Sequence, residues 1–446
     1  MEGGDLAAAL IEAAKRAGAE SADALVIRSR DIGVSVRGGA LEEAESAESV
    51  DYGLRVLIGR RHASVSASDP DPRVLAEMAA RAVAMARAAP EDPWCGLPEA
   101  ALLADLAALP DLDIEDAAAP PSPARLRELA ERSEAAALGV AGVAQVESAG
   151  ASWRRSSVAY VATNGFSGGY ARTGASLSVS AIAGEGVGME TDHDFASRTH
   201  YADLPSAEEI GRRAGRRAAA RLKPRRAKTG AYPVLFDRRV AGSLLGHLLG
   251  AINGEAVARG ASWLKDRMGE AVLPAGFDLT DDPHRRRGAG SRPFDGEGMA
   301  MAPRPLVEGG VLQGWVLDLA TARRLGLRAP GGARRGVGAP PSPGVSNLTL
   351  SEGARSRDEL IAAMGEGLVV TSLIGSSISA TTGAYSRGAS GFWVEGGAIA
   401  FPVNELTIAG SLPEFLMRMT AANDADRSKS LITPSLLVEG LTIASG

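Results

Sequence analysis

The chain has 446 residues, 45% of them hydrophobic, which predicts a multidomain globular protein with one large core or several ordinary ones. Its 54 acidic and 48 basic residues give a formal net charge of -6, which argues against a general affinity for nucleic acid or anionic lipid. The single cysteine, Cys95, cannot form an intrachain disulfide, so we expect a reducing compartment, the cytoplasm. We expect no signal peptide, because the N-terminus has no cationic start followed by an apolar run. We expect no membrane span, because no later stretch offers about 20 apolar residues.

Residues 1–110 are predicted to form a helix, an antiparallel meander and a second helix. Asp5 is expected to cap the first helix, and Gly18 to end it. Alternating apolar residues between positions 24 and 68 predict about five strands. Asp71, followed by proline, predicts the start of the closing helix.

Residues 111–226 repeat this order of elements. Ser122, followed by proline, predicts a helix that continues to residue 138. Strands are expected within residues 143–183, around a hairpin turn formed by an Asn-Gly pair. Ser206 is expected to cap the closing helix. The repeated order predicts an internal duplication.

The remainder, residues 227–446, begins with a short apolar strand and an apolar helical stretch at residues 240–257. Short runs of valine, isoleucine and leucine then alternate with glycine-rich turns. The expected fold class is α+β: two helix and antiparallel-sheet units, followed by a larger, mostly β C-terminal domain.

One polar segment is the best local candidate for a metal site. It contains Asp192, His193 and Asp194, with His200 and Asp203 close behind, and imidazole and carboxylate groups are common metal ligands. The spacing matches no ligand template, and such a polar stretch is more often a solvated loop. A stand-alone metallopeptidase that uses these residues is nevertheless one alternative for the function.

Basic residues cluster toward the end of the second unit. They are Arg212, Arg213, Arg216, Arg217, Arg221, Lys223, Arg225, Arg226 and Lys228. Their helical spacing favours a solvated helix face, with binding to an acidic partner as the alternative.

Several motifs in the second half occur in the order typical of one family. They are Phe294-Asp295-Gly296-Glu297-Gly298, Asp318-Leu319-Ala320-Thr321-Ala322, Thr382-Gly383-Ala384-Tyr385-Ser386-Arg387-Gly388-Ala389-Ser390-Gly391-Phe392-Trp393, and Phe401-Pro402-Val403-Asn404-Glu405. With these motifs the chain resembles the TldD/PmbA family, and the run that begins at Ser386 is similar to the TldE/PmbA branch.

The resemblance implies a heterodimeric peptidase that acts on unfolded peptides or small proteins. In that family a TldD-type subunit holds zinc through a His-Glu-x-x-x-His helix and a late cysteine. The corresponding positions here are Gly246, His247 and Ala251, and no cysteine follows Cys95. Glycine and alanine have no side-chain donor, and His247 replaces the glutamate base. We therefore expect no metal and no catalytic residue in this chain, and zinc in a TldD-type partner.

A binding role remains for such a subunit, namely holding an extended peptide by main-chain hydrogen bonds. We expect the contacts at Thr382, Gly383, Tyr385, Ser386 and Arg387. The favoured hypothesis is a non-catalytic subunit that helps to form the peptide cleft, is inactive alone and can form a homodimer when isolated. A further alternative is a binding or regulatory protein of the gyrase-modulator type that works independently of any protease.

Overall fold

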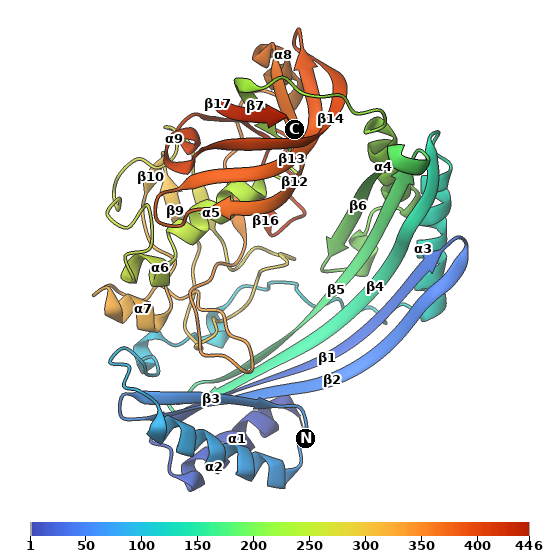
Figure 1. The fold of residues 1–446 in the computed structure, drawn as a ribbon. Helices are drawn as coiled ribbons and strands as arrows, with labels where there is room; N and C mark the ends of the chain where they lie inside the picture. Colours follow the sequence, from blue (N-terminus) through green and yellow to red (C-terminus); the bar gives the residue numbers. More distant parts are fainter. Residues whose placement is uncertain (1, 446) are drawn as a thin grey trace.

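The computed structural model describes residues 2–445 and has the predicted α+β class. Figure 1 shows the N-terminal strands as a long curved band, with the C-terminal strands gathered opposite one end of it. None of the described helices is both long and apolar enough to cross a membrane.

The first unit contains α1 (Gly3–Ala17), β1 (Ser21–Arg37), β2 (Ala40–Ile58), β3 (Arg61–Ala67) and α2 (Pro72–Ala88). The prediction that Asp5 caps α1 is wrong, because Glu2 is the capping residue and its backbone N–H donates to the Asp5 carboxylate at 3.3 Å. Gly18 ends the helix with a φ of 97°, as predicted. Asp71 caps α2 by accepting from the backbone N–H of Arg73 at 2.8 Å, which confirms that prediction.

The second unit contains α3 (Pro123–Leu138), β4 (Val143–Ala162), β5 (Ser167–Ala183), β6 (Glu190–Arg198) and α4 (Ala207–Ala220). Short 3-10 turns lie at Ala100–Leu102, Leu106–Ala108, Gly186–Gly188 and Tyr201–Asp203. Both units share one sheet in the order β3-β2-β1-β4-β5-β6, with β1 antiparallel to β4 at its centre. The same element order on both sides of this centre agrees with a duplication, and the division at residues 110 and 226 stays a prediction.

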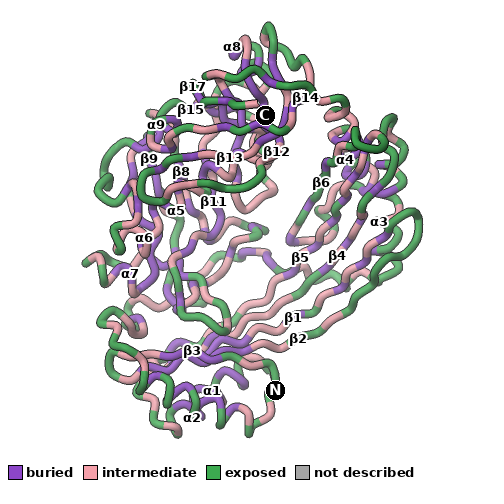
Figure 2. Tube along the Cα trace, in the orientation of Figure 1, coloured by how far each residue is buried: buried purple, intermediate pink, exposed green. Residues whose placement is uncertain are grey.

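The N-terminal strands are longer and fewer than predicted. Three strands, two of them 17 and 19 residues long, replace the five expected between residues 24 and 68. The reason is that β1 serves two cores: Ala24 and Val26 pack under α1 and α2, whereas Val34 and Val36 pack with the second unit. Where β2 leaves the first core it is mostly exposed, pink or green in Figure 2, yet it stays paired to β1. The alternation of apolar residues stops where β2 leaves the core, although the strand itself continues, so the pattern predicts shorter strands.

The C-terminal part is built from two sheets. Its strands are β7 (Gly230–Phe236), β8 (Leu279–Asp281), β9 (Arg304–Glu308), β10 (Val311–Leu312), β11 (Leu348–Leu350), β12 (Gly367–Ile378), β13 (Ala384–Glu395), β14 (Ala398–Ser411), β15 (Met419–Ala421), β16 (Leu431–Ile432) and β17 (Leu436–Ser445). The larger sheet has the order β14-β13-β12-β7-β17-β15, and a further pairing of β14 with β17 closes it into a barrel. The smaller sheet has the order β10-β9-β8-β11-β16.

Short helices accompany these sheets: α5 (Gly242–Ala251), α6 (Gly254–Ala258), α7 (Leu319–Arg324), α8 (Arg357–Met364) and α9 (Leu412–Leu416). Helix α5 contributes Leu244, Leu245 and Leu248 to the same core as Trp393 of the barrel. This packing fixes the position of the helix that carries Gly246, His247 and Ala251.

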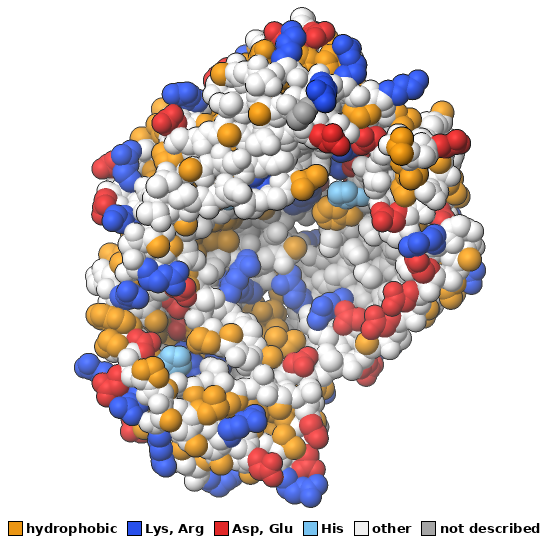
Figure 3. Space-filling view, viewed as in Figure 1, with side chains coloured by type: hydrophobic (Ala, Val, Ile, Leu, Met, Phe, Trp, Pro, Cys, Tyr) orange, Lys and Arg blue, Asp and Glu red, His pale blue; other side chains and the backbone are white. Residues whose placement is uncertain are grey.

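A buried junction connects the N-terminal sheet to the C-terminal part. Phe294 packs edge-to-face on Phe166, with 5.0 Å between ring centroids. Beside these rings, Asp23 of β1 forms buried ion pairs with Arg55, at 2.6 Å, and with Arg335. Away from the junction the molecule is hollowed between the N-terminal sheet and the C-terminal part, and Lys and Arg side chains gather along the hollow (Figure 3).

Candidate functional site

Helix α5 carries Gly246, His247 and Ala251, the three positions that the resemblance assigns to a metal site, and part of its surface is bare. Gly246 and Gly250 are exposed, and a Cβ added to either would meet no atom within 4 Å. His247 lies beside them, half-buried, whereas Ala251 is buried and its carbonyl accepts from Ser262 Oγ at 2.5 Å. One imidazole without a second donor does not fit a zinc ion, which needs three or four protein ligands.

His247 faces the start of β13 through Tyr385. The two rings meet edge-to-face at 5.7 Å, and the Tyr385 ring packs on Phe415 from another side at 5.3 Å. Burial, and after it the charge of Arg387, lowers the pKa of His247, so the imidazole is neutral at neutral pH. Burial raises the pKa of Tyr385 to about 12. Both side chains are therefore neutral hydrogen-bonding groups.

These two side chains have unsatisfied polar atoms. Within residues 2–445, neither His247 Nε2 nor the Tyr385 hydroxyl has a hydrogen-bond partner, although both atoms are buried. Ser243 Oγ, one turn before His247 on α5, is in the same state. Unsatisfied buried polar groups are costly, and a bound ligand or water would satisfy these three atoms.

The remaining predicted peptide contacts lie in and around the turn that leads into β13. Thr382 is exposed, and Gly383 has a φ of 74° with Pro413 so close that a Cβ would lie 2.5 Å from its ring. Ser386 is half-buried, and Arg387 Nε donates to the Gly375 carbonyl at 2.7 Å. The structure thus brings Tyr385 and Arg387 to His247, and their role in binding peptide stays a prediction.

Strand β6 corrects the prediction of a solvated loop around Asp192. Asp192 and Asp194 point to one side of the strand and are only 6% and 7% exposed. Asp194 forms ion pairs of 2.6 Å with both Arg213 and Arg217 of α4, and Asp192 pairs with Arg239. The carboxylates are buried because these arginines neutralise them, so part of the basic cluster faces the protein instead of solvent.

The candidate metal ligands are not brought together. His193 lies on the opposite face of β6 from Asp192, and His200 contacts Asp113 Oδ1 at 3.2 Å. Asp203 forms an ion pair of 2.8 Å with Arg287. Among residues 2–445, no group of three or more His, Cys, Asp or Glu side chains is placed to hold a metal ion.

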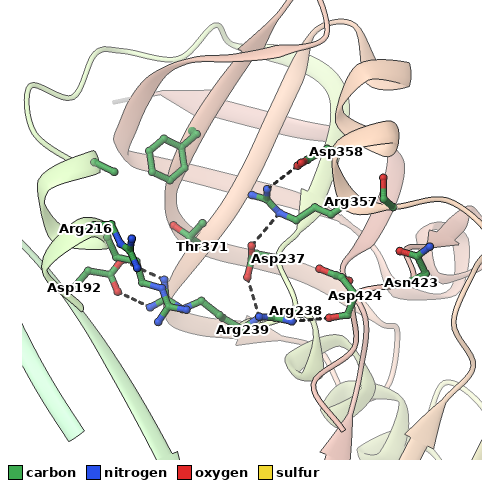
Figure 4. A pocket seen from close by; sticks show the side chains of 14 residues that line it. Asp192, Arg216, Asp237, Arg238, Arg239, Arg357, Asp358, Thr371, Asn423 and Asp424 are labelled. Carbon is green, nitrogen blue, oxygen red and sulfur yellow. Dashed lines mark hydrogen bonds and ion pairs between the residues drawn. The ribbon is translucent and has the colours of Figure 1, made fainter. Parts of the chain in front are cut away.

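A cavity of about 600 Å³ lies between α4 and β6 on one side and the barrel with α8 on the other. Its walls carry five arginines and four aspartates, several of them joined in ion pairs (Figure 4). Sequence reasoning missed this cavity. The arginines at positions 238 and 239, directly after an apolar strand, are the only local signal for it.

Asp295 and Glu297 form a buried pair of acidic side chains that the sequence did not predict. Asp295 accepts from the backbone N–H groups of Glu297, Met299 and Gly332 at 2.8 to 2.9 Å. Glu297 lies next to it and accepts from the backbone N–H of Leu319 at 2.9 Å. Burial, and after it the neighbouring Asp295, raises the pKa of Glu297 to about 8. The motif that carries both acids organises the junction described above.

The three-part fold is that of a metallopeptidase-like class of protein, and the chain belongs to the PmbA/TldD family. It matches the first, central and C-terminal domains of the PmbA/TldA metallopeptidases over residues 22–86, 116–222 and 229–445. Within the family it lies on the PmbA side. It is 35% identical over 427 residues to the metalloprotease PmbA of Escherichia coli O157:H7, covering 95% of this chain and 92% of that one.

Solved structures agree with this assignment. A protein from Bacteroides thetaiotaomicron, described as a proposed modulator of DNA gyrase, superposes with a TM-score of 0.89 and 26% identity over 99% of this chain and 98% of that one. TldE from Thermococcus kodakarensis shares the fold, with a TM-score of 0.83 and 21% identity over 99% of this chain and all of that one.

Proposed function

We propose that this chain is the metal-free, non-catalytic subunit of a TldD/TldE-type heterodimeric metalloprotease. In this proposal a cytoplasmic TldD-type partner holds the zinc and cuts the peptide. The observation that carries it is the α5 surface, where Gly246 and Gly250 leave open space and His247 is the one imidazole. The helix lacks both a glutamate at position 247 to act as general base and a second side-chain donor to share a metal with His247.

The second part of the proposal is that this surface helps to form the cleft for unfolded peptides or small proteins. The free Tyr385 hydroxyl and His247 Nε2 are neutral groups that suit peptide amides. The glycines of α5 let a peptide backbone approach closely, since no side chain stands in the way. Thr382, Ser386 and Arg387 border the same region from the β13 side.

The test is to purify the chain alone, the TldD-type partner alone and the two together. Each preparation is analysed for zinc and is then incubated with an unfolded peptide. We expect a complex of the two chains, stoichiometric zinc only where the partner is present, and peptide cleavage only by the complex. Cleavage by this chain alone, with zinc bound to it, would refute the proposal.

A second experiment addresses the cleft itself. Gly246→Leu fills the open surface of α5 without disturbing the buried face, so the complex should still assemble but should lose cleavage of peptide. Gly4→Leu, on the exposed surface of α1 where a Cβ also meets no atom within 4 Å, is the control. Equal activity of the Gly246→Leu complex and the parent complex would show that no peptide passes over α5.

A further inference from the structure

The large cavity between α4 and the barrel is lined by five arginines, and not all of them form ion pairs. Arg239 pairs with Asp192, and Arg357 Nε lies 3.2 Å from Asp237. Arg217 forms an ion pair with Asp194 of β6, which does not itself line the cavity. These contacts account for three of the five arginines that face the cavity.

Arg216 and Arg238 remain. Within residues 2–445 neither forms an ion pair, and the only hydrogen bond of the Arg238 side chain there is to the backbone carbonyl of Asp424, at 2.8 Å. The Asp424 carboxylate is held instead by the backbone N–H and hydroxyl of Ser435. Figure 4 shows Arg216 on one side of the cavity and Arg238 on another. Two guanidinium groups are thus available to a ligand from different walls.

The surroundings reinforce the positive field. Burial, together with Arg238, Arg239 and Arg217, lowers the pKa of Lys429, although Asp426 opposes the shift. Burial, and after it Arg239, also lowers the pKa of Arg217. Cations that destabilise one another at a cavity wall are stabilised by a bound anion.

An independent observation indicates a ligand. Thr371 of β12 lines this cavity and is 9% exposed, and its hydroxyl has no hydrogen-bond partner among the described residues. In Figure 4 it projects from the barrel wall into the space between Arg216 and Arg357. A buried hydroxyl without a partner is costly unless a ligand or water satisfies it.

The size and lining decide the class of anion. A volume of about 600 Å³ is in the range of small-molecule sites, far larger than a single inorganic ion needs. Phe392 and Ala220 add apolar surface to the wall. A ligand with separated carboxylates on an organic body fits these features, since guanidinium and carboxylate form paired hydrogen bonds.

We propose that this cavity binds an acidic peptide segment, whose carboxylates pair with Arg216 and Arg238 while Thr371 supplies a hydroxyl. The proposal rests on the proposed function, because it names the class of peptide that the subunit would favour. It places that recognition between α4 and the barrel strand β12, in a cavity that no residue of α5 lines.

The experiment measures binding to the isolated chain by fluorescence anisotropy. The probe is a labelled alanine-rich peptide that ends in glutamates with a free C-terminal carboxylate. Two matched peptides have the C-terminus amidated, or amidated with glutamines in place of glutamates. We expect binding to weaken in that order and to weaken with added salt.

Variants locate the site. Arg216→Ala and Arg238→Ala should each weaken binding about tenfold, the loss of a charge-assisted hydrogen bond. Arg212→Ala, an exposed arginine of the same helix outside the cavity lining, is the control and should bind like the parent. Both cavity arginines are exposed, so their loss should leave the thermal midpoint unchanged.

Inorganic phosphate is added as a competitor to separate the sources of the anion. We expect phosphate to displace the peptide only at concentrations far above the peptide's Kd. The proposal is overturned if the glutamine amide binds as well as the acid, if the arginine variants match the control, or if phosphate binds more tightly than the peptide. Because no partner subunit takes part, this result is independent of whether the complex cleaves peptide.

Discussion

Replacing Glu297 with glutamine should flatten the dependence of stability on pH. The Glu297 carboxyl is 2% exposed, and its pKa lies at about 8 instead of the ordinary 4.5. A folded-state pKa above the unfolded one means that the stabilising contribution is complete below about pH 4.5 and is lost as pH rises toward 8. At about 1.36 kcal/mol per pH unit, the loss over this window is roughly 5 kcal/mol.

The glutamine side chain keeps an oxygen that can accept from the Leu319 N–H, and it carries no proton to lose. The variant should therefore resemble the parent at low pH and exceed it in stability near pH 8. Urea unfolding followed by tryptophan fluorescence, at several pH values between about 5 and 8, measures this difference. Glu308→Gln, an exposed glutamate on β9, is the control. Parallel pH profiles for parent and Glu297→Gln would refute the reasoning.

Three other substitutions have defined outcomes. Gly211→Ala places a Cβ 2.0 Å from the Ser133 carbonyl, so α3 and α4 must separate. Calorimetry should show that the free energy of unfolding falls by about 1–3 kcal/mol. The control is Gly246→Ala, whose Cβ meets no atom within 4 Å and which should cause no loss of stability. Asp23→Ala leaves two buried arginines unpaired and should cost about 3–5 kcal/mol in urea unfolding, where a change under 1 kcal/mol would show the pair to be unimportant. Tyr385→Phe removes a hydroxyl that has no partner in the described chain, so the thermal midpoint should not fall, while peptide cleavage by the complex should.

Helix ends and turns could be predicted from the sequence because their causes are local. The caps at Asp71, Ser122 and Ser206 each accept a backbone N–H two or three residues ahead, and the turn at Asn164 separates β4 from β5. The exception is Asp5, which takes part in the capping box of α1 as its third helical residue, whereas Glu2 is the N-cap. Such errors of a few residues arise because several polar side chains near a helix start can accept the same donors.

Strand length and the burial of charge could not be predicted, because both depend on distant residues. Asp192 is a polar residue in a polar stretch until α4 and Arg239 surround it, and those arginines are some 20 to 50 positions later. Similarly, the sequence shows that α5 has one imidazole, but not that Ala251 faces the core while Gly246 faces solvent. The cavity between α4 and the barrel joins residues from 192 to 424, a distance that no local pattern reports.

The central pairing of β1 with β4 has a consequence for synthesis of the chain. Ser29 pairs with Ser49 on one side, which the ribosome supplies soon afterwards, and with Ser156 on the other, more than a hundred residues later. Until β4 emerges, one long edge of β1 has unpaired backbone groups, and such edges invite pairing with other chains. Arg30, Asp31 and Arg37 place charged side chains along β1, and such charges disfavour association of exposed strands from different chains.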